Sequence, residues 1–509
     1  MFTTSSVCGD LIALFTTFCV IFITYFKWQY QYWQKRNLQY LKPSMPLGTP
    51  AVTSDLKQHL GIKLKQVYDI MKEKKWKHGG VYIFHQPVYV VTDLDYLKNI
   101  MSRDFQYFSD RGMYYNEKAD PITGHLFHIG GPKWKNLRRK FTPTFTSGKM
   151  KMMFQTLLDC EVNLRKQIEL SCNKQDPIDI KEVLGCFTTD IIGSCAFGLD
   201  CNSFKEENSP FRVYGRKVFE RSFSRILKRR FASNLPNLAK LLNISLVPKD
   251  ISHFFIDLVK NTVEYRGKNK IVRNDFLQLL IDLKTEDDKE SSNQDGTSLT
   301  IEEIAAQSFV FFIAGFETSS TTMTFALYEL ARNQHIQDKV REEINTVLEK
   351  HEGKITYDAI QEMKYLEQVI NEALRMYPPA SLLSRKCVKD YKIPDSDVIL
   401  EKGMVVLIPI LGIHHDKEYY PDPEKFDPNR FSEENKSLRH SYTHIPFGEG
   451  PRICIGLRFG IMQSKVGLVS LLKNFKFTIN QKTQEPLEMK VNSLVLATKG
   501  EIWLNAHKI

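Results

Sequence analysis

The residue of this chain best suited to hold a metal is a single cysteine in a glycine-rich turn. Cys454 lies in Phe447–Gly456, a stretch with the sequence Phe-Gly-Glu-Gly-Pro-Arg-Ile-Cys-Ile-Gly. Gly450 permits a tight turn, and Gly456 permits a flat group to approach the backbone closely. One thiolate here can be the axial ligand of an iron, while a buried structural thiol is a common use of a free cysteine. The turn alone leaves both interpretations open.

The residues on either side of Cys454 favour the charged form of its thiol. The run 457–466 has helical spacing, so Cys454 would lie near unpaired backbone N–H groups and the positive end of a helix dipole. Both effects stabilise a thiolate. Arg452, two residues earlier, can donate charge-assisted hydrogen bonds to a carboxylate on a bound group.

A second polar feature interrupts a long apolar helix. The capping box Thr-Ile-Glu-Glu at 300–303 predicts a helix from Ile301 to about Arg332. Inside it, residues 314–318 (Ala-Gly-Phe-Glu-Thr) bring a glycine, a charge and a hydroxyl, and Thr318 can bond back to the carbonyl of the preceding turn and loosen it. Taken alone, this pattern has two interpretations. It can be a polar notch in the helix, or a tolerated glycine beside an exposed Glu317.

A basic segment supplies candidate groups for binding an anion. Trp134 and Arg138 are four residues apart on a predicted helix and therefore share one face. The other basic residues of 133–140 fit a solvated face, and they fit a surface that meets an acidic partner. His125 and His128 lack carboxylate or cysteine neighbours, which disfavours a metal site there.

Another charged pair precedes a helix stop. Glu372 and Arg375 lie at i and i+3 on one helical face, just before Pro378 and Pro379 end the helix. Most such pairs lie on the surface and contribute less than about 1 kcal/mol.

Length, charge and cysteine usage limit the class of protein. The chain has 509 residues, a net charge of +11 and nine cysteines without paired spacing, so neither a disulfide framework nor a Cys-x-x-Cys zinc site is expected and the compartment should be reducing. No nucleic-acid motif accompanies the basic charge, which favours an anionic membrane surface or an acidic protein partner. Length suggests several domains, yet no central linker or repeat divides the chain. We expect one large, mainly α-helical domain over 51–509, with Lys284–Gly296 as an exposed loop.

The N-terminus predicts a membrane attachment. Residues 1–27 contain the apolar run Leu11–Phe26 and form a transmembrane signal anchor, and residues 28–50 form a linker with a proline hinge. Lysine and arginine follow this run and none precedes it, which places the body of the chain in the cytosol. A cleaved signal peptide is the alternative, but a basic start and a small-residue cleavage site are missing. The segment Phe211–Phe231 is amphipathic, which fits either a helix that lies on a lipid surface or an ordinary surface helix with one buried face.

A small β region is expected beside the helices. Val81–Phe84 and Val88–Val91 flank a turn and predict a strand pair. Val398–Leu400 and Met404–Ile408 flank Glu-Lys-Gly and predict a hairpin. Asn492–Ala497 predicts a strand turn that projects apolar side chains.

Taken together and in their order along the chain, the motifs resemble the cytochrome P-450 haem-thiolate monooxygenases. Phe-x-x-Gly-x-Arg-x-Cys-x-Gly around Cys454 is the most specific match, and Phe141–Met150 and Asp110–Gly112 look similar to insect microsomal, xenobiotic-metabolising members. The resemblance implies a single triangular prism of helices with a small β region. It also implies haem b (iron protoporphyrin IX) as cofactor, with Cys454 as the metal ligand.

The resemblance further implies a role for each candidate site residue. Thr318 and Glu317 would be catalytic, holding the reacting oxygen and relaying protons. Glu372 and Arg375 would be buried and joined by Arg430 as a scaffold. The remaining cofactor-binding residues would be Arg452, Trp134, Arg138, Arg111, Arg385, Phe447 and Gly456. The substrate pocket would be lined by Phe127, Phe312, Ala314, Leu382, Leu383 and Leu496.

The implied function is insertion of one oxygen atom from O2 into small lipophilic substrates, such as xenobiotics, plant toxins, insecticides, terpenoids or steroids. Electrons from NADPH would arrive through NADPH-cytochrome P-450 reductase, with cytochrome b5 as a second candidate donor, because the chain has no dinucleotide-binding fingerprint of its own. The location would be the endoplasmic reticulum membrane, facing the cytosol, with no nucleic-acid partner. Two rivals remain open: a haem-thiolate isomerase or dehydratase, and a non-enzymatic membrane haem sensor.

Overall fold

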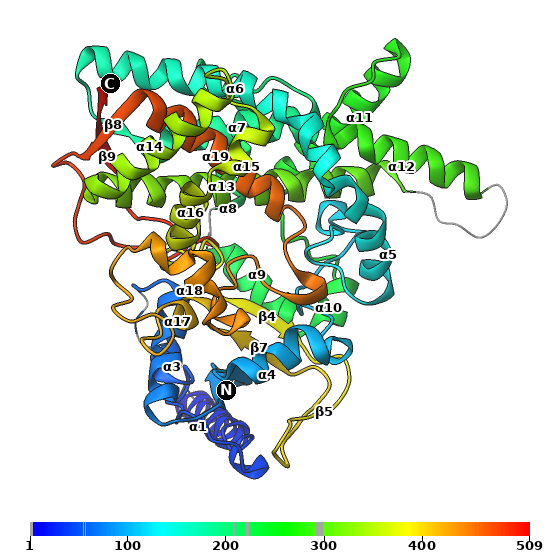
Figure 1. Ribbon diagram of the computed structural model, residues 1–509. Helices are drawn as coiled ribbons and strands as arrows, with labels where there is room; N and C mark the ends of the chain where they lie inside the picture. The colour runs from blue at the N-terminus through cyan, green and yellow to red at the C-terminus, as the bar shows by residue number, and fades with distance from the viewer. Residues whose placement is uncertain (1–3, 54, 56, 207–208, 220–222, 292–298) are drawn as a thin grey trace. The chain divides into compact units, whose positions relative to one another are not determined.

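Two compact units account for the chain in the computed structural model, which describes residues 4–53, 55, 57–206, 209–219, 223–291 and 299–509 (Figure 1). Unit 1 consists of Met1–Ser109 and Leu382–Ile413, and unit 2 of Asp110–Ser381 and His414–Ile509. The predicted division at residues 27 and 50, with one domain over 51–509, stays a prediction.

Unit 1 is built from short helices and a small sheet. Its helices and turns are α1 (Thr4–Gln29), η1 (Gln34–Arg36), α2 (Pro50–Thr53), α3 (Leu60–Glu73), α4 (Leu94–Lys98), η2 (Asn99–Arg103) and η3 (Phe105–Tyr107). Its strands are β1 (His78–Ile83), β2 (Gln86–Val91), β4 (Leu383–Lys386), β5 (Tyr391–Lys392), β6 (Ile399–Leu400) and β7 (Val405–Ile408). The short helix α17 (Ile410–His414) ends at the first residue of unit 2's second segment.

The main sheet of unit 1 has the strand order β1-β2-β7-β4. The predicted strand pair is confirmed as the antiparallel pair β1–β2, in which Ile83 lies opposite Gln86. The predicted hairpin over 398–408 is wrong, because β6 pairs with β5, while β7 pairs with β2 and β4. An apolar run such as Val405–Ile408 fits a central strand, and its partners are chosen by packing that local sequence does not reveal.

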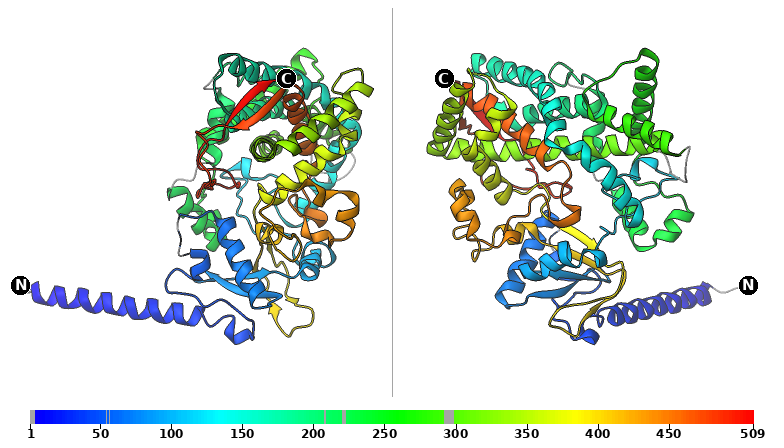
Figure 2. Two further views of the ribbon diagram at one scale, coloured as in Figure 1. Left: turned by 60° about the vertical axis from the view of Figure 1, so that its left-hand side comes forward. Right: turned by 45° about the vertical axis from the view of Figure 1, so that its right-hand side comes forward.

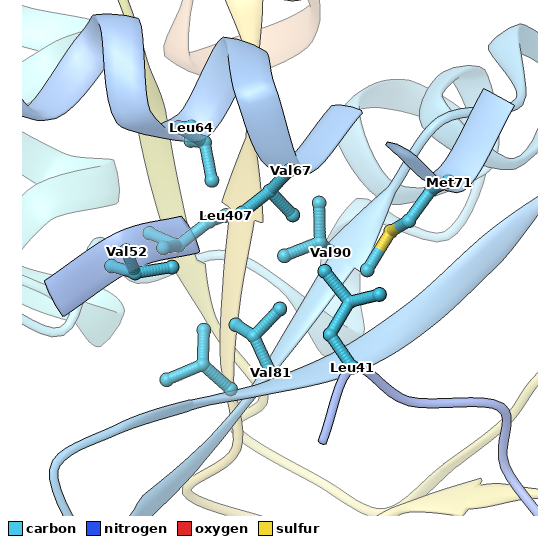
Figure 3. Packing of buried hydrophobic residues seen from close by; sticks show 9 residues of the cluster. Leu41, Val52, Leu64, Val67, Met71, Val81, Val90 and Leu407 are labelled. Atoms are coloured by element: carbon cyan, nitrogen blue, oxygen red, sulfur yellow. The ribbon is translucent and has the colours of Figure 1, made fainter. Parts of the chain in front are cut away.

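Buried aliphatic side chains hold this sheet against α3. Figure 3 shows them at close range, converging from the helix, from the strands and from the segment before α2. They are Leu41, Val52, Leu64, Val67, Met71, Val81, Val88, Val90 and Leu407. Each fully buried side chain of this kind stabilises the folded state by about 1.5–3 kcal/mol relative to an exposed one.

The N-terminal helix α1 is long and apolar enough to cross a membrane. It extends away from the rest of unit 1 (Figure 2), and its large apolar side chains face solvent instead of a core. They include Leu11, Ile12, Leu14, Phe15, Phe18, Val20 and Ile21. Signal sequences near the N-terminus are also long and apolar. Length and composition alone therefore do not show that α1 spans a membrane.

The segment after α1, which contains the predicted proline hinge, is hydrogen-bonded to the sheet. Backbone hydrogen bonds run from Leu41 N to Gly80 O at 3.0 Å and from Phe84 N to Leu47 O at 2.9 Å, so this segment continues the sheet beyond β1. Trp33 is fully buried, and its indole N–H donates to Val81 O at 3.2 Å.

Unit 2 is mainly helical. Its helices are α5 (Gly131–Phe141), α6 (Ser147–Lys174), α7 (Ile180–Phe197), α8 (Pro210–Phe219), α9 (Phe223–Asn234), α10 (Pro236–Leu241), α11 (Lys249–Asn269), α12 (Phe276–Ser291), α13 (Ile301–Arg332), α14 (Gln334–Lys350), α15 (Tyr357–Glu362), α16 (Lys364–Met376), α18 (Glu433–Ser437) and α19 (Leu457–Asn474). Its short turns are η4 (Pro121–Thr123), η5 (Thr142–Phe145), η6 (Pro428–Phe431), η7 (Ser441–Thr443) and η8 (Gly450–Arg452). Its antiparallel sheet has the order β3 (Ile178–Asp179), β9 (Trp503–Lys508) and β8 (Phe475–Ile479).

Because α12 extends to Ser291, the loop predicted over Lys284–Gly296 is helical up to Ser291, and 292–296 lie outside the described residues.

Helix α13 is the central element of unit 2. Its predicted bounds are confirmed, since Thr300 and Glu303 form a complete capping box at its start and the helix ends at Arg332. It packs against α7, α11, α16 and α19 (Figure 1). The helix is continuous through 314–318, so the predicted loosening does not interrupt it.

Gly315 has a packing reason that the sequence did not show. A Cβ atom placed there would lie 2.4 Å from Ile192 Cδ1 on α7, which is closer than real atoms approach. Glycine at this position therefore lets α7 and α13 come into close contact.

We expect Gly315→Ala to lower the free energy of unfolding. Overpacking costs about 1–3 kcal/mol, which outweighs the gain of about 1 kcal/mol in helix propensity. In an Ile192→Ala background the clash is removed, so the same substitution should stabilise the protein. Denaturant midpoints of the four proteins in this double-mutant cycle measure the change of sign; equal effects of Gly315→Ala in both backgrounds would contradict the contact.

Candidate active site

Cys454 lies in a turn that requires two glycines and leads directly into α19. Gly448 and Gly450 have φ angles of 72° and 71°, in the left-handed region that favours glycine. The turn is closed by a hydrogen bond from Cys454 N to Phe447 O at 2.9 Å. Helix α19 begins at Leu457, as predicted.

The environment of the Cys454 thiol contains opposing electrostatic effects. The Cys454 side chain is exposed to solvent, although the surrounding protein still desolvates a charged thiolate at this position. Burial raises the pKa of the Cys454 thiol, while the Gly456 N–H and the guanidinium groups of Arg138 and Arg111 act to lower that pKa. A metal cation bound to the sulfur would add to the effects of the Gly456 N–H, Arg138 and Arg111 and would favour the thiolate.

Three arginines and a tryptophan gather next to this turn. The buried Arg452 guanidinium lies 3.9 Å from the centre of the Trp134 ring and donates to Ile129 O at 3.0 Å. Arg111 donates to Arg452 O at 3.2 Å. Burial lowers the pKa of Arg138, and Cys454 opposes that shift. The structure thus brings together four of the predicted cofactor-binding residues around Cys454.

The basic face of α5 is only partly available to a partner. Lys135 and Arg139 are exposed, as expected for a docking surface. Lys133 instead forms ion pairs with Glu117 at 2.7 Å and with Glu303 at 2.8 Å. It therefore ties α5 to the start of α13, which the local charge pattern did not indicate.

Arg385 lies on β4 in unit 1. Its side chain is fully buried, and its Nε atom has no hydrogen-bond partner among the described residues. Burial alone lowers the pKa of Arg385 to about 10, and no carboxylate opposes this shift. A buried guanidinium in this state fits an anionic group of a ligand.

Thr318 and Ala314 lie one turn apart on α13. The Thr318 hydroxyl donates to Ala314 O at 2.5 Å, as the sequence predicted. Ala314 is exposed and Thr318 is half-buried. This part of the helix therefore presents a small side chain and a hydroxyl to accessible space.

Glu317 faces a separate cavity of about 300 Å³. Burial raises the pKa of Glu317, while the charges of Lys181, Arg212, Lys490 and Arg216 oppose that shift. These basic residues come from three distant segments, so no sequence pattern linked them to Glu317. They are the functional candidates that sequence reasoning missed.

The predicted pocket residues have different environments. Phe127 is exposed, and its ring lies 4.2 Å from the Arg111 guanidinium. The Phe312 side chain is fully buried and packs in an aromatic cluster with Phe197, Phe211 and Phe255, so its place in a pocket wall stays a prediction.

Three leucines complete the predicted pocket. Leu496 is also buried, and its N–H donates to Pro379 O at 3.0 Å; its place in a pocket wall stays a prediction. Leu382 packs on the aliphatic cluster of unit 1, and Leu383 begins β4 opposite Ile408.

Glu372, Arg375 and Arg430 lie together in unit 2. The Glu372 and Arg375 side chains are fully buried and are joined by two hydrogen bonds, of 2.7 and 2.9 Å. Arg430 Nε lies 3.4 Å from Glu372 Oε1. The backbone N–H of Asp427 also donates to Glu372, at 3.0 Å. The cluster thereby joins α16 to the segment before α18.

We expect Glu372→Gln to destabilise the protein strongly. The substitution keeps the shape of the side chain but leaves Arg375 without its buried counter-charge, which costs about 3–5 kcal/mol. Unfolding in denaturant measures the loss. Glu362→Gln, in an exposed pair with His351, is the matched control and should change stability by less than about 1 kcal/mol; similar losses for the two variants would contradict the expected difference.

The two histidines before α5 do not form a metal site. Among the described residues, no group of three or more His, Cys, Asp or Glu side chains could hold a metal ion. His125 and His128 pack with their ring centres 4.2 Å apart. Burial lowers the pKa of His128 to about 3, which keeps its imidazole neutral.

The residues around Cys454 fit a haem. The sulfur is accessible, no atom lies within 4 Å of the position that a Cβ on Gly456 would occupy, and the neighbouring arginines can neutralise two carboxylates. This donor set matches a flat, dianionic group with one thiolate ligand.

Comparisons with known proteins agree with this arrangement. Residues 43–505 match the family model described as Cytochrome P450. The probable cytochrome P450 6a14 of Drosophila melanogaster is 43% identical over 493 residues, covering 94% of this chain and 96% of that protein. Cytochrome P450 6A1 of Musca domestica is 42% identical over 491 residues, covering 95% of each chain.

This chain therefore belongs to the cytochrome P450 family. It is a haem-thiolate monooxygenase, an oxidoreductase whose cofactor is haem b, and its sequence is of the insect type. The mostly helical fold with small sheets, predicted from the sequence, is confirmed.

Proposed function

We propose that this protein inserts one oxygen atom from O2 into small lipophilic substrates, with Cys454 as the axial thiolate ligand of its haem. The observation that carries this proposal is the accessible Cys454 sulfur beside the Gly456 N–H, Arg111 and Arg138 at the start of α19. When bound, the haem iron supplies oxygen activation, which the electron-donating thiolate favours.

The chain's own residues hold the cofactor and move protons. Arg111, Trp134, Arg138 and Arg452, all in unit 2, would hold the haem carboxylates. In unit 1, the buried guanidinium of Arg385 has a charge that fits an anionic group of a ligand. Phe447 and Gly456 border the ring. The Glu372, Arg375 and Arg430 cluster supports the turn that carries Cys454.

Thr318 and Glu317 are the residues to which we assign contact with the reacting oxygen and proton transfer. The Thr318 hydroxyl donates its single proton to Ala314 O at 2.5 Å, and during the reaction it would turn that proton from Ala314 O toward the reacting oxygen. Glu317 exchanges protons with the cavity beside it, since burial raises the pKa of its carboxyl toward the range useful for proton transfer. Ala314 and Phe127 contact the substrate; both have accessible surface, which supports this role.

Electrons come from NADPH through NADPH-cytochrome P-450 reductase, with cytochrome b5 as a second donor. The exposed Lys135 and Arg139 on α5 fit an acidic partner. The substrates are xenobiotics, plant toxins, insecticides, terpenoids or steroids, to which the exposed Phe127 and Ala314 offer apolar surface.

The protein acts at the endoplasmic reticulum membrane, with its catalytic part in the cytosol. α1 anchors it, because its exposed apolar side chains need a hydrocarbon environment. On α10 and the turn after it, Leu238, Leu241 and Leu242 are exposed as well, which supports a lipid contact there. Alkaline washing of membranes tests the anchor: the full chain should stay in the pellet, and a full chain found in the wash would contradict it.

Product formation tests the reaction. Purified protein, reductase, NADPH and a panel of lipophilic compounds should yield singly oxygenated products, and omission of NADPH or reductase should abolish them. Compounds that displace the iron-bound water, seen by absorption, identify candidate substrates. Turnover without an electron source would favour an isomerase or dehydratase, and haem binding without turnover on the whole panel would favour a sensor.

A further inference from the structure

A histidine outside the predicted site caps the end of α16. The carbonyl groups in the last turn of a helix have no partner within the helix. His414, the last residue of α17, has its Nδ1 atom 3.2 Å from the carbonyl oxygen of Arg375, one residue before α16 ends. The Arg375 guanidinium in return donates to the carbonyl of His414 at 2.9 Å. These two residues are therefore joined in both directions.

The other nitrogen of the same ring binds a different segment. Ile445 N donates to His414 Nε2 at 3.0 Å. A backbone N–H can only donate, so Nε2 must be the unprotonated acceptor and the ring proton must lie on Nδ1, where it is donated to Arg375 O. The imidazole is consequently neutral with a fixed tautomer. Burial, His444, His415 and Arg375 lower the pKa of His414 well below its ordinary value, which agrees with this state.

Ile445 belongs to the segment that becomes the cysteine turn. Gly448 N donates to Ile445 O at 3.0 Å, and Cys454 N donates to Phe447 O at 2.9 Å. A chain of hydrogen bonds thus leads from the end of α16 through the His414 ring into the turn that carries the sulfur. His444, next to Ile445, is separately joined to α16, with its Nε2 atom 3.2 Å from Asn371 O.

Packing alone is the competing explanation for His414. Its ring is fully buried and lies 5.4 Å from the His444 ring at an angle of 21°. A residue that only fills space would be replaced best by another ring. A residue that acts through Nε2 would be replaced best by a side chain with an acceptor at the same position.

We propose that His414 is a positioning residue, whose Nε2 atom fixes the backbone of Ile445 and thereby the turn that presents the Cys454 sulfur to the haem. This inference rests on the proposed role of Cys454 as axial ligand. It adds a defined link between the Glu372, Arg375 and Arg430 cluster and that ligand, through one acceptor atom.

Three variants of the full-length holoprotein separate the two explanations. His414→Gln places an amide oxygen near the position of Nε2 and keeps the acceptor. His414→Asn keeps a donor near the position of Nδ1 but removes the Nε2 acceptor. His414→Phe keeps the ring and removes both groups. The wild type is measured alongside, and absence of a red-shifted band there would count against Cys454 as ligand, independently of His414.

Two readouts that do not depend on turnover are measured. In the reduced carbon monoxide complex, His414→Gln should keep most of the red-shifted band, while His414→Asn and His414→Phe should lose at least about half of it. Hydrogen exchange at the amide of Ile445 should become about tenfold faster in the Asn and Phe variants only, as expected for loss of one hydrogen bond. Amides in α7 and α13 should exchange as in the wild type.

The proposal would be overturned by any of three results. His414→Phe could keep the band better than His414→Gln, which would assign the residue to packing. Ile445 exchange could be unchanged in His414→Asn, which would show that Nε2 holds nothing. Exchange in α7 and α13 could rise as much as at Ile445, which would assign His414 to general stability. If His414→Phe does not fold, the Gln and Asn variants decide between these explanations.

Discussion

Replacing Cys454 with serine should abolish the red-shifted absorption of the reduced carbon monoxide complex. A serine hydroxyl is a hard, neutral donor with a much higher pKa than a thiol, so it does not supply the soft anionic ligand on which this band depends. The nearby Arg111 and Arg138 favour an anion at this position, and they cannot make serine an adequate substitute. We expect at least about a hundredfold loss of oxygenase turnover.

Cys172→Ser is the matched control for this prediction. Cys172 is a free, half-buried cysteine on α6, and its replacement should leave both the band and the turnover unchanged. A Cys454→Ser protein with full haem content and an unaltered band would refute the assignment of the axial ligand.

Thr318→Ala should separate electron consumption from product formation. The Thr318 hydroxyl occupies the turn of α13 where Ala314 is exposed, and the proposal assigns to it a hydrogen bond that guides protons to the reacting oxygen. Without it, NADPH should still be consumed, but hydrogen peroxide should be released in place of product. We expect product per NADPH to fall by about tenfold or more, in the lower range for a positioned proton-transfer group.

Thr322→Ala controls for the helix itself. Thr322 makes the same kind of back-bond one turn later, to Thr318 O at 2.8 Å, but its side chain is buried. This variant should lose a similar amount of helix stabilisation and keep product formation coupled to NADPH use. Equal peroxide release by both variants would assign the effect to helix geometry, and full coupling in Thr318→Ala would contradict the proton-delivery role.

Features determined by local sequence were predicted well. The capping box at 300–303 fixes the start of α13, because its two hydrogen bonds involve residues three apart. The helix after Cys454 and the left-handed Gly450 likewise follow from short-range backbone preferences. The bond from Thr318 to Ala314 was predictable because it spans a single helical turn.

Features determined by distant partners were not predictable from one sequence. Lys133 looked like part of a docking surface, but Glu303 lies beside it only after α13 has packed. Glu317 looked exposed or catalytic from its neighbours, while its basic cavity is assembled from α7, α8 and the segment before β9. Phe312 and Leu496 are apolar residues near the expected site, and burial in a core was the alternative that periodicity cannot distinguish from a cavity wall.

The attachment of residues 39–48 to β1 affects how a shorter version of the protein should be made. Removing α1 takes away exposed apolar surface, but a cut placed after Gly48 would also remove Trp33 from its position against Gly80 and strip the hydrogen-bonding partner from one side of β1. An unpaired sheet edge promotes aggregation. A soluble version should therefore begin close to Tyr30, with the proline-containing stretch retained as part of the fold.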